Sequence, residues 1–477
     1  MNAVVDDRAL WAAVGGALSE RVSPAILPGT VRDLVKQWAG VAAYATSRGG
    51  DPAAARAEEL RQLFAASSVE RLQQLAVLAP EDPATVDILL AEAGRVLADD
   101  VRNAARQAPP QAVPPLLARQ VLTLSLRWFD EDVQAAAPLL QVFTGHGADE
   151  VVAPAQASSS MVARLADWFA ERMGCPVTIE HATVISGGFS RLMLDVQWAG
   201  RDISGRCVVR IEQDGMFATA GRREAQIMCA VQSAGYPVPV ILWEEPDPSI
   251  LGEPFFVMEW VTGVARLDDD GLDDVLRSVR ELHALGRPTV DSVAAVDGLP
   301  AGCSPQEAIA LQLKHCYDVY QRSTQHPVPL LERGFAWLET ELRPTHRTVI
   351  VHGDAGPGNA LHDGSGIAAV IDWEFAHAGD PAEEWAYLAL IRGRRIMSAD
   401  AWKERLTRVV GVTYDESTWR AWELYNGVKY ACINLTALTV FLRSSSPTPD
   451  HLAIGVAVHL RFLGRVVDLM GVRDGHE

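Results

Sequence analysis

Three oxygen-bearing side chains stand at the ends of two short apolar runs in the C-terminal half of the sequence. Asp354 follows the run at residues 348–351, Asn359 lies five residues further on, and Asp372 ends the run at residues 367–371. Apolar runs of this length between His, Gly and Asp residues predict short buried strands. Mg²⁺ prefers carboxylate and amide oxygens, and phosphoryl transfer needs a carboxylate to align the attacking hydroxyl. The segment therefore predicts a magnesium-dependent phosphoryl-transfer site, whereas the plain alternative is a hairpin with two acidic turns.

The order of these residues also carries a family resemblance. The segment H-G-D-x-x-x-x-N at residues 352–359, followed by I-D-W-E at residues 371–374, resembles the aminoglycoside phosphotransferase and choline kinase group, relatives of the protein kinases. The resemblance covers about residues 160–470 and implies an α+β, bilobal, protein-kinase-like fold with a β-rich N-lobe and a mostly helical C-lobe. It implies ATP and Mg²⁺ as cofactors, although GTP stays open as the donor.

The resemblance assigns a role to each residue of this segment. Asp354 is the expected catalytic residue, which orients the acceptor hydroxyl and takes its proton. Asn359 and Asp372 are the expected metal ligands. His352 and Glu374 are expected to support the site structurally, with His352 bracing the catalytic loop by hydrogen bonds rather than transferring a proton.

A glycine-containing turn upstream is expected to cover the ATP phosphates. It lies between two predicted strands and lacks the G-x-x-x-x-G-K-[ST] pattern of a P-loop, which argues against a Walker-type ATPase. A turn of this kind by itself is often only a hairpin, but in the resembled family a similar turn lets backbone N–H groups approach the phosphates. The residues expected to bind the cofactor here are Ser186, Gly187, Gly188, Phe189 and Ser190.

A strand cation braced by a helix carboxylate is the next feature that the resemblance implies. Arg210 lies in a predicted strand and Glu224 in the following helix, so we expect them to pair and to bind the α- and β-phosphates. Many family members have Lys at this position, and Arg is a bulkier, forked donor. Arg222 or Arg223 could also supply the cation, and both residues of the pair could instead be ordinary surface residues.

The segment at residues 255–263 resembles the hinge between the two lobes. Met258 would line the adenine pocket, and the backbone of Glu259 and Val261 would bond the base. These contacts use the backbone, so the side chains barely distinguish a hinge from one more buried strand.

Residues after the metal site are expected to shape the acceptor pocket. Asp380 precedes Pro381 and is predicted to cap a helix, while Glu384 stands where the family often has Asp and is given no catalytic role. Basic residues follow, which suit phosphate or carboxylate groups but could also be a solvated helix end. The expected substrate residues are Arg392, Arg394 and Arg395.

The identity of the molecule that accepts the phosphoryl group is the feature that the sequence determines least. A branch of the family that is similar to the kinase part of acyl-CoA dehydrogenase fusions suggests a hydroxyacyl-CoA thioester or a similar acidic, partly apolar alcohol. One alternative is phosphorylation of an aminoglycoside or macrolide antibiotic. Another is a catalytically idle binding or scaffold protein with a kinase-like fold.

The length of 477 residues suits two or three domains, and the composition excludes some classes of protein. A net charge of −19 argues against nucleic-acid binding, and six cysteines without a C-x-x-C pair argue against a disulfide framework. No apolar stretch is long enough to span a membrane, so we expect a soluble, cytoplasmic protein.

In the N-terminal region, apolar residues recur at helical spacing, and no polar residues are spaced as in a catalytic site. We expect this region to be an accessory domain for homo-oligomer or partner contacts. The predicted domains are a helical domain at residues 1–143, a linker at 144–160, the N-lobe with hinge at 161–262 and the C-lobe at 263–477. Within the N-lobe we expect helices at residues 161–173 and 219–233 and strands at 191–198, 203–211 and 254–261.

Overall fold

The structure is a computed structural model of the whole chain, with side chains. It describes residues 41, 44, 52–79, 82–106, 115–144, 156–185, 192–201, 203–212, 221–324, 326–389, 397–443 and 448–471. The chain divides into two compact units. One, called the helical unit here, comprises Met1–Val151, Gln312–Leu342 and Glu423–Glu477, and the other, called the mixed unit, comprises Val152–Leu311 and Arg343–Trp422.

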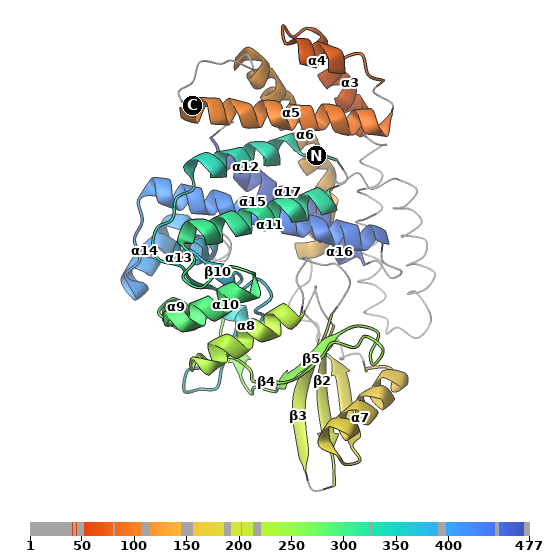
Figure 1. The fold of residues 1–477 in the computed structure, drawn as a ribbon, viewed down its shortest axis with the longest axis vertical. Helices are drawn as coiled ribbons and strands as arrows, with labels where there is room; N and C mark the ends of the chain where they lie inside the picture. The colour runs from red at the N-terminus through yellow and green to blue at the C-terminus, as the bar shows by residue number, and fades with distance from the viewer. Residues whose placement is uncertain are drawn as a thin grey trace. The chain divides into compact units, whose positions relative to one another are not determined.

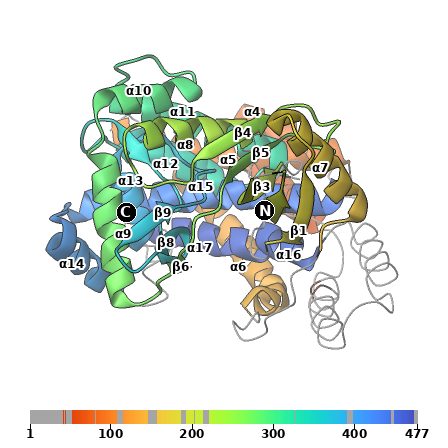
Figure 2. The same ribbon diagram turned by 90° about the horizontal axis from the view of Figure 1, so that it is seen from below.

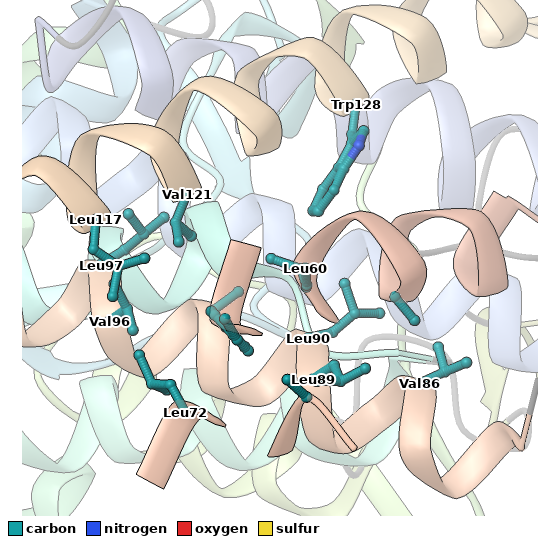
Figure 3. Packing of buried hydrophobic residues seen from close by; sticks show 14 of the residues in the cluster. Leu60, Leu72, Val86, Leu89, Leu90, Val96, Leu97, Leu117, Val121 and Trp128 are labelled. Atoms are coloured by element: carbon teal, nitrogen blue, oxygen red, sulfur yellow. The ribbon is translucent and has the colours of Figure 1, made fainter. Parts of the chain in front are cut away.

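The described part of the helical unit consists of helices packed around leucine and valine side chains. Leu60, Leu89, Leu97 and Trp128 are almost fully buried in its main cluster (Figure 3). The unit joins the N-terminal helices to two later segments that the sequence analysis assigned to the C-lobe. Its helices are α3 (Pro52–Ala65), α4 (Glu70–Leu75), α5 (Pro83–Arg106), α6 (Pro115–Thr144), α12 (Pro329–Glu341), α16 (Pro449–Ala453), the π-helix η4 (Ile454–Val458) and α17 (His459–Leu469). Helices α11 (Pro305–Ser323) and α15 (Glu416–Arg443) contribute residues to both units.

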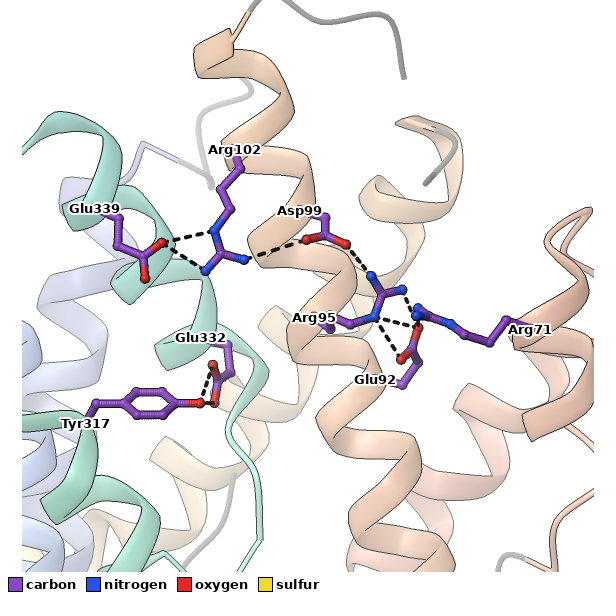
Figure 4. A network of polar contacts seen from close by, with 8 residues as sticks. All are labelled: Arg71, Glu92, Arg95, Asp99, Arg102, Tyr317, Glu332 and Glu339. Carbon is purple, nitrogen blue, oxygen red and sulfur yellow. Dashed lines mark hydrogen bonds and ion pairs between the residues drawn. The ribbon is translucent and has the colours of Figure 1, made fainter. Parts of the chain in front are cut away.

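A charged network lies along helix α5 in the helical unit (Figure 4). Arg95 binds both Glu92 and Asp99 on its own helix, and Arg102 reaches Glu339 of α12 at 2.9 Å. A glycine allows the two helices to approach closely, because a Cβ at Gly94 would lie 2.7 Å from Cγ of Glu332. Thus α5, from the N-terminal region, packs against a helix more than two hundred residues later in the chain.

The mixed unit begins with an antiparallel five-stranded sheet in the order β1-β2-β3-β5-β4 (Figure 1). Its elements are α7 (Ser159–Met173), β1 (Thr178–Val184), β2 (Leu192–Ala199), β3 (Ser204–Ile211), α8 (Gly221–Ser233), β4 (Ile241–Glu245) and β5 (Phe255–Glu259). The helices and strands predicted for the N-lobe are therefore confirmed to within three residues, and the structure adds β1 and β4 to them.

The alternation of side chains along β3 gives the sheet two apolar faces. Cys207, Val209 and Ile211 pack with Phe169 of α7 on one face. Val208 packs on the other face with residues of α8, among them Met228. Residue 210 shares the face of residue 208, so the strand period directs the Arg210 side chain toward α8.

Short strands in the rest of the mixed unit carry the segment that was expected to do chemistry. Strand β7 (Val349–Val351) pairs with β10 (His377–Gly379), and β8 (Ala360–His362) lies between β6 (Val264–Ala265) and β9 (Ile367–Val370). Helix α9 lies beside β9 (Figure 2). The remaining elements are α9 (Asp269–His283), α10 (Arg287–Val296), the 3₁₀ turn η1 (Pro357–Asn359), α13 (Pro381–Tyr387) and α14 (Ala399–Val410). The two predicted apolar strands, at residues 348–351 and 367–371, are confirmed as β7 and β9.

No helix among the described residues is both long and apolar enough to cross a membrane.

A buried histidine at the end of α9 makes the stability of the mixed unit sensitive to acid. Burial lowers the pKa of His283 from its ordinary 6.5 to about 3, and its ring packs edge-on against Trp385 at 5.0 Å between ring centroids. Below pH 6.5 the His283 ring is therefore protonated in the unfolded chain but stays neutral in the folded chain. As a result, folding stability falls as the pH drops from about 6.5 toward 3. At pH 5 the loss from this residue is about 2 kcal/mol.

We therefore expect His283→Phe, which keeps an aromatic ring but cannot be protonated, to lose less stability on acidification than the unchanged protein. The measurement is the thermal midpoint of both proteins at pH 7 and at pH 5. An equal decrease in midpoint for the two proteins would contradict the assignment to His283.

Candidate active site

The loop after β7 presents Asp354, and Gly353 makes its sharp turn possible. Gly353 has φ of +83°, in the left-handed region that side chains disfavour. A Cβ there would also lie 2.6 Å from the carbonyl oxygen of Phe375. Both the turn and the close approach of the neighbouring loop therefore require glycine immediately before Asp354.

His352 is buried and bonded to backbone at both ring nitrogens. The N–H of Asp354 donates to its Nδ1 at 3.3 Å, and its Nε2 lies 3.1 Å from the carbonyl oxygen of Ile371. With Nδ1 accepting, Nε2 carries the proton and donates it to that carbonyl. The ring also packs against Trp373 at 4.7 Å. This arrangement supports the predicted bracing role, because neither nitrogen is left for proton transfer.

Asn359 returns to Asp354 through the 3₁₀ turn η1. Its Nδ2 donates to the backbone oxygen of Asp354 at 2.8 Å and to the side-chain Oδ2 at 3.0 Å. Since the amide nitrogen faces Asp354, the amide oxygen points the other way and can accept a cation. Ile371, just before Asp372, donates its N–H to the Asn359 carbonyl at 2.9 Å, which ties the two loops together.

Asp372 follows β9 in an uncommon backbone conformation. Its φ is +68°, and it is the only non-glycine residue with a positive φ in the part of the chain that the structure describes. Asp tolerates this region better than most residues, although at some cost in energy, and such strain is commonly found at functional sites. Its side chain is about one-third exposed, and its Oδ1 accepts a hydrogen bond of 2.9 Å from Nη2 of Arg210.

Arg210 is buried among three carboxylates. Its Nε lies 3.1 Å from Glu224, its Nη2 lies 2.9 Å from Asp372, and the same Nη2 lies 3.8 Å from Glu374. Burial by itself would lower the pKa of Arg210, but the charges of Glu224, Asp372 and Glu374 outweigh it and raise that pKa further. One guanidinium thus faces three carboxylates, which makes this cluster a candidate for binding a cation.

The other two candidate arginines lie elsewhere. Arg223 forms a forked pair with Asp297 at 2.6 and 2.9 Å and donates to the carbonyl oxygens of Glu374 and Ala376. Arg222 is exposed. The structure therefore brings Glu224 together with Arg210, as expected from the strand and helix positions, whereas Arg223 anchors α8 to the loop after Asp372. Whether Arg210 contacts a nucleotide stays a prediction.

The predicted hinge lies at the end of β5. Met258 is buried in the apolar cluster that includes Val208 of β3 and Val370 of β9. The N–H of Glu259 donates to the carbonyl oxygen of Val240 at 2.9 Å, and Val261 follows the strand, partly exposed. The apolar surroundings of Met258 suit a flat aromatic base, and the adenine contacts stay a prediction.

Two predicted groups lie outside the described residues. They are the phosphate-covering turn of Ser186, Gly187, Gly188, Phe189 and Ser190, and the basic cluster of Arg392, Arg394 and Arg395.

The structure adds residues of α13 that the sequence analysis left without a role. Glu384 is fully buried, and its carboxylate accepts hydrogen bonds from the backbone N–H groups of His352 and Gly353, the latter at 3.2 Å. The hydroxyl of Tyr387 donates to Oδ1 of Asp354. Asp380 caps α13 as predicted, and it also accepts from the backbone N–H of Thr345 at 2.7 Å. A spacing of three residues between two polar side chains on one helix was the available signal.

This site occurs within a known family. The sequence model of the phosphotransferase enzyme family matches residues 181–425, just over half of the chain and all of the described site. The chain belongs to this family. The predicted recognition is therefore confirmed, and with it the assignment as a phosphotransferase. The predicted α+β fold, with a helical region before an antiparallel sheet and a mostly helical part after it, is also confirmed.

Individual relatives of this phosphotransferase match shorter stretches. Mouse acyl-CoA dehydrogenase family member 10 is 32% identical over 180 residues, which is 36% of this chain and 17% of that protein. Human acyl-CoA dehydrogenase family member 11 is 27% identical over 180 residues, 35% of this chain and 22% of that protein. The match therefore spans about a fifth of these relatives.

Solved structures with a similar arrangement include a macrolide 2′-phosphotransferase from Brachybacterium faecium, with 18% identity and a TM-score of 0.41 over 62% of this chain and 97% of that one. Another is an ethanolamine kinase from Plasmodium vivax, with 14% identity and a TM-score of 0.42 over 62% of this chain and 82% of that one.

The role of Gly353 can be tested by substitution. Gly353→Ala combines an unfavourable φ with a contact of 2.6 Å to Phe375, so we expect a loss of about 1–3 kcal/mol in stability and a larger loss of turnover as Asp354 moves. The measurement is thermal unfolding together with phosphotransferase rate.

Gly364 provides a matched control, because it has φ of +95° but nothing lies within 4 Å of the position of a Cβ. Gly364→Ala isolates the backbone cost and should retain turnover. Similar effects of the two substitutions would show that the contact with Phe375 does not matter.

Proposed function

We propose that this phosphotransferase moves the γ-phosphoryl group of ATP, with Mg²⁺, to a hydroxyl group of an acidic, partly apolar small molecule. The observation that carries the proposal is the direct contact of Asn359 with Asp354, next to an Asp372 that is tied to the Arg210–Glu224 pair. Three oxygen-bearing groups thus converge where a nucleotide phosphate, a metal ion and an alcohol would have to meet.

Asp354 acts on the acceptor. Its carboxylate orients the hydroxyl and takes the hydroxyl proton while the alcohol oxygen bonds to the γ-phosphorus. The bond from that phosphorus to the bridging oxygen breaks, and its electron pair leaves with ADP. The products are a phosphate ester, ADP and one proton.

Asn359 and Asp372 are the residues that would hold Mg²⁺. The hydrogen bond from Asn359 Nδ2 to Asp354 directs its amide oxygen away from that carboxylate, and Asp372 has a second oxygen besides the one that Arg210 contacts. This all-oxygen set fits a hard divalent ion, and so do the carboxylates around Arg210. When bound, Mg²⁺ neutralises charge on the nucleotide phosphates.

The remaining predicted contacts concern the nucleotide. Arg210 would bind its phosphates together with the turn at residues 186–190, while Met258, Glu259 and Val261 would contact adenine. Bracing by Glu224 supports this role of Arg210, because a paired guanidinium is held in one orientation before the nucleotide arrives.

A hydroxyacyl-CoA thioester is the acceptor that we favour. The similarity to acyl-CoA dehydrogenase family members 10 and 11 supports it, because proteins with that name act on CoA thioesters. The predicted basic cluster of Arg392, Arg394 and Arg395 would suit the phosphates of coenzyme A. We also propose that residues 1–143 serve contacts with a partner or a second copy.

Metal binding at Asp372 can be measured without knowing the acceptor. Binding of Mg²⁺ and ATP at one hundred times the dissociation constant should stabilise the folded chain by about 2.7 kcal/mol and raise the thermal midpoint. We expect Asp372→Ala to abolish the part of this increase that EDTA removes.

Asp363→Ala is the matched control, because Asp363 is an acidic residue nine positions before Asp372 whose carboxylate accepts hydrogen bonds from the N–H and the hydroxyl of Ser365 in its own turn. It should retain the full increase. Metal-dependent stabilisation that persists in Asp372→Ala would exclude Asp372 as a ligand. If the unchanged protein showed no metal-dependent stabilisation, a catalytically idle, scaffold-like role would be favoured.

The acceptor class can be tested by a screen of alcohols, hydroxyacyl-CoA thioesters, aminoglycosides and macrolides. We expect ATP consumption with a hydroxyacyl-CoA and a product that is heavier by one phosphoryl group in mass spectrometry. Phosphorylation of an antibiotic, together with resistance of a sensitive strain that expresses the gene, would exclude the CoA proposal.

A further inference from the structure

Helix α13 contacts the loop at residues 352–354 through both its backbone and a side chain. Glu384 binds the backbone of the loop, and Tyr387, three residues later and so on the same helix face, binds the side chain of Asp354. Tyr387 is almost fully buried, with 3% of its surface exposed. A buried phenol that is bonded to the predicted catalytic carboxylate is a feature that the mechanism above does not use.

The hydrogen bonds of the Asp354 carboxylate show how the phenol of Tyr387 restricts its orientation. Asn359 donates to Oδ2, and Tyr387 donates to Oδ1. Because Asn359 and Tyr387 donate to different oxygens, the plane of the carboxylate is held at two points and cannot rotate freely about its last side-chain bond. A carboxylate oxygen has two lone pairs, so one such hydrogen bond does not by itself use up its capacity as an acceptor.

We propose that Tyr387 is a positioning residue for phosphoryl transfer, which holds the Asp354 carboxylate in the orientation that receives the acceptor hydroxyl. The proposal rests on the proposed function, in which Asp354 takes the proton of that hydroxyl. Tyr387 itself neither gains nor loses a proton in the reaction. Its donated hydrogen bond stays in place while the alcohol oxygen bonds to phosphorus and ADP leaves.

The orientation matters because transfer requires the hydroxyl oxygen, the phosphorus and the leaving oxygen to lie nearly in line. A misplacement of about 1 Å can cost about one hundredfold in rate. Asn359 cannot replace Tyr387, because it contacts the opposite oxygen and is also the predicted metal ligand. Loss of the phenol oxygen should therefore reduce turnover and leave the binding of the nucleotide nearly unchanged.

The test is a double-mutant cycle on the full chain with Tyr387→Phe, Asp354→Ala and the double variant. The probe is ATP with Mg²⁺ and water as the acceptor, so the rate is that of ATP hydrolysis. We expect Tyr387→Phe to reduce kcat by about 10- to 100-fold with the KM for ATP within twofold. In the Asp354→Ala background the same change should alter the rate by less than twofold, because the group that it positions is gone.

Tyr320→Phe is the control for loss of a buried hydroxyl, since Tyr320 accepts a hydrogen bond of 2.7 Å from the N–H of Val328 and is fully buried in the helical unit. It should lower the thermal midpoint and leave kcat unchanged.

Three results overturn the inference. One is a kcat for Tyr387→Phe within twofold of the unchanged protein, and another is an equal fold-loss in both backgrounds, which would mean a general effect on the fold. The third result is that the unchanged protein neither hydrolyses ATP nor is stabilised by it. This result would overturn the proposed function, and the role of Tyr387 with it. Stabilisation by ATP together with an insensitive kcat overturns the role of Tyr387 alone.

Discussion

A positive charge that is buried among carboxylates is the interaction on which the rest of the site depends. Arg210 has only 5% of its side chain exposed, and a guanidinium in that position is tolerated only if it is paired. Its partners come from three places along the chain: Glu224 on α8, and Asp372 and Glu374 on the loop after β9. The sheet, the helix and the loop that carries Asp372 are therefore held together by one electrostatic requirement.

The same cluster is where we propose that a divalent ion binds. On that proposal Asp372 serves both Arg210 and the ion. Asp372 contacts Arg210 from a strained backbone conformation, and strain of this kind persists where the surrounding contacts hold it in place.

Helix α13 organises the catalytic loop by a second principle. A loop lacks the hydrogen-bond ladder of a helix or strand, so its buried N–H groups need acceptors from other elements. Glu384 provides acceptors for His352 and Gly353, and Asp380 does so for Thr345. Burial raises the pKa of Asp380, and hydrogen bonds from the hydroxyl of Thr345 and from nearby backbone N–H groups act against that effect. The acidic residues of α13 thus replace missing backbone partners, while its last residue, Tyr387, reaches the carboxylate of Asp354.

The sequence by itself determined the order and spacing of the candidate site residues. Asp354, Asn359 and Asp372 could be singled out because they lie on one short segment, where strand ends and a turn place them in fixed order. The strand period along β3 also directs Arg210 toward α8. These features depend on neighbouring residues and on the geometry of a single element, so periodicity and spacing are sufficient to predict them.

Only the tertiary structure decided which distant groups meet. The sequence predicted that Arg210 pairs with Glu224 but left Arg222 and Arg223 as alternative cations. The packing of α8 assigned Arg223 to Asp297 and left Arg222 exposed. The contacts of Glu384 and Tyr387 with the catalytic loop depend on the rotation of α13 about its own axis, which its seven residues do not specify. Likewise, α5 packs against α12 through Gly94 although hundreds of residues separate them. Sequence spacing constrains groups on one element, whereas contacts between elements follow from the packing of the whole core.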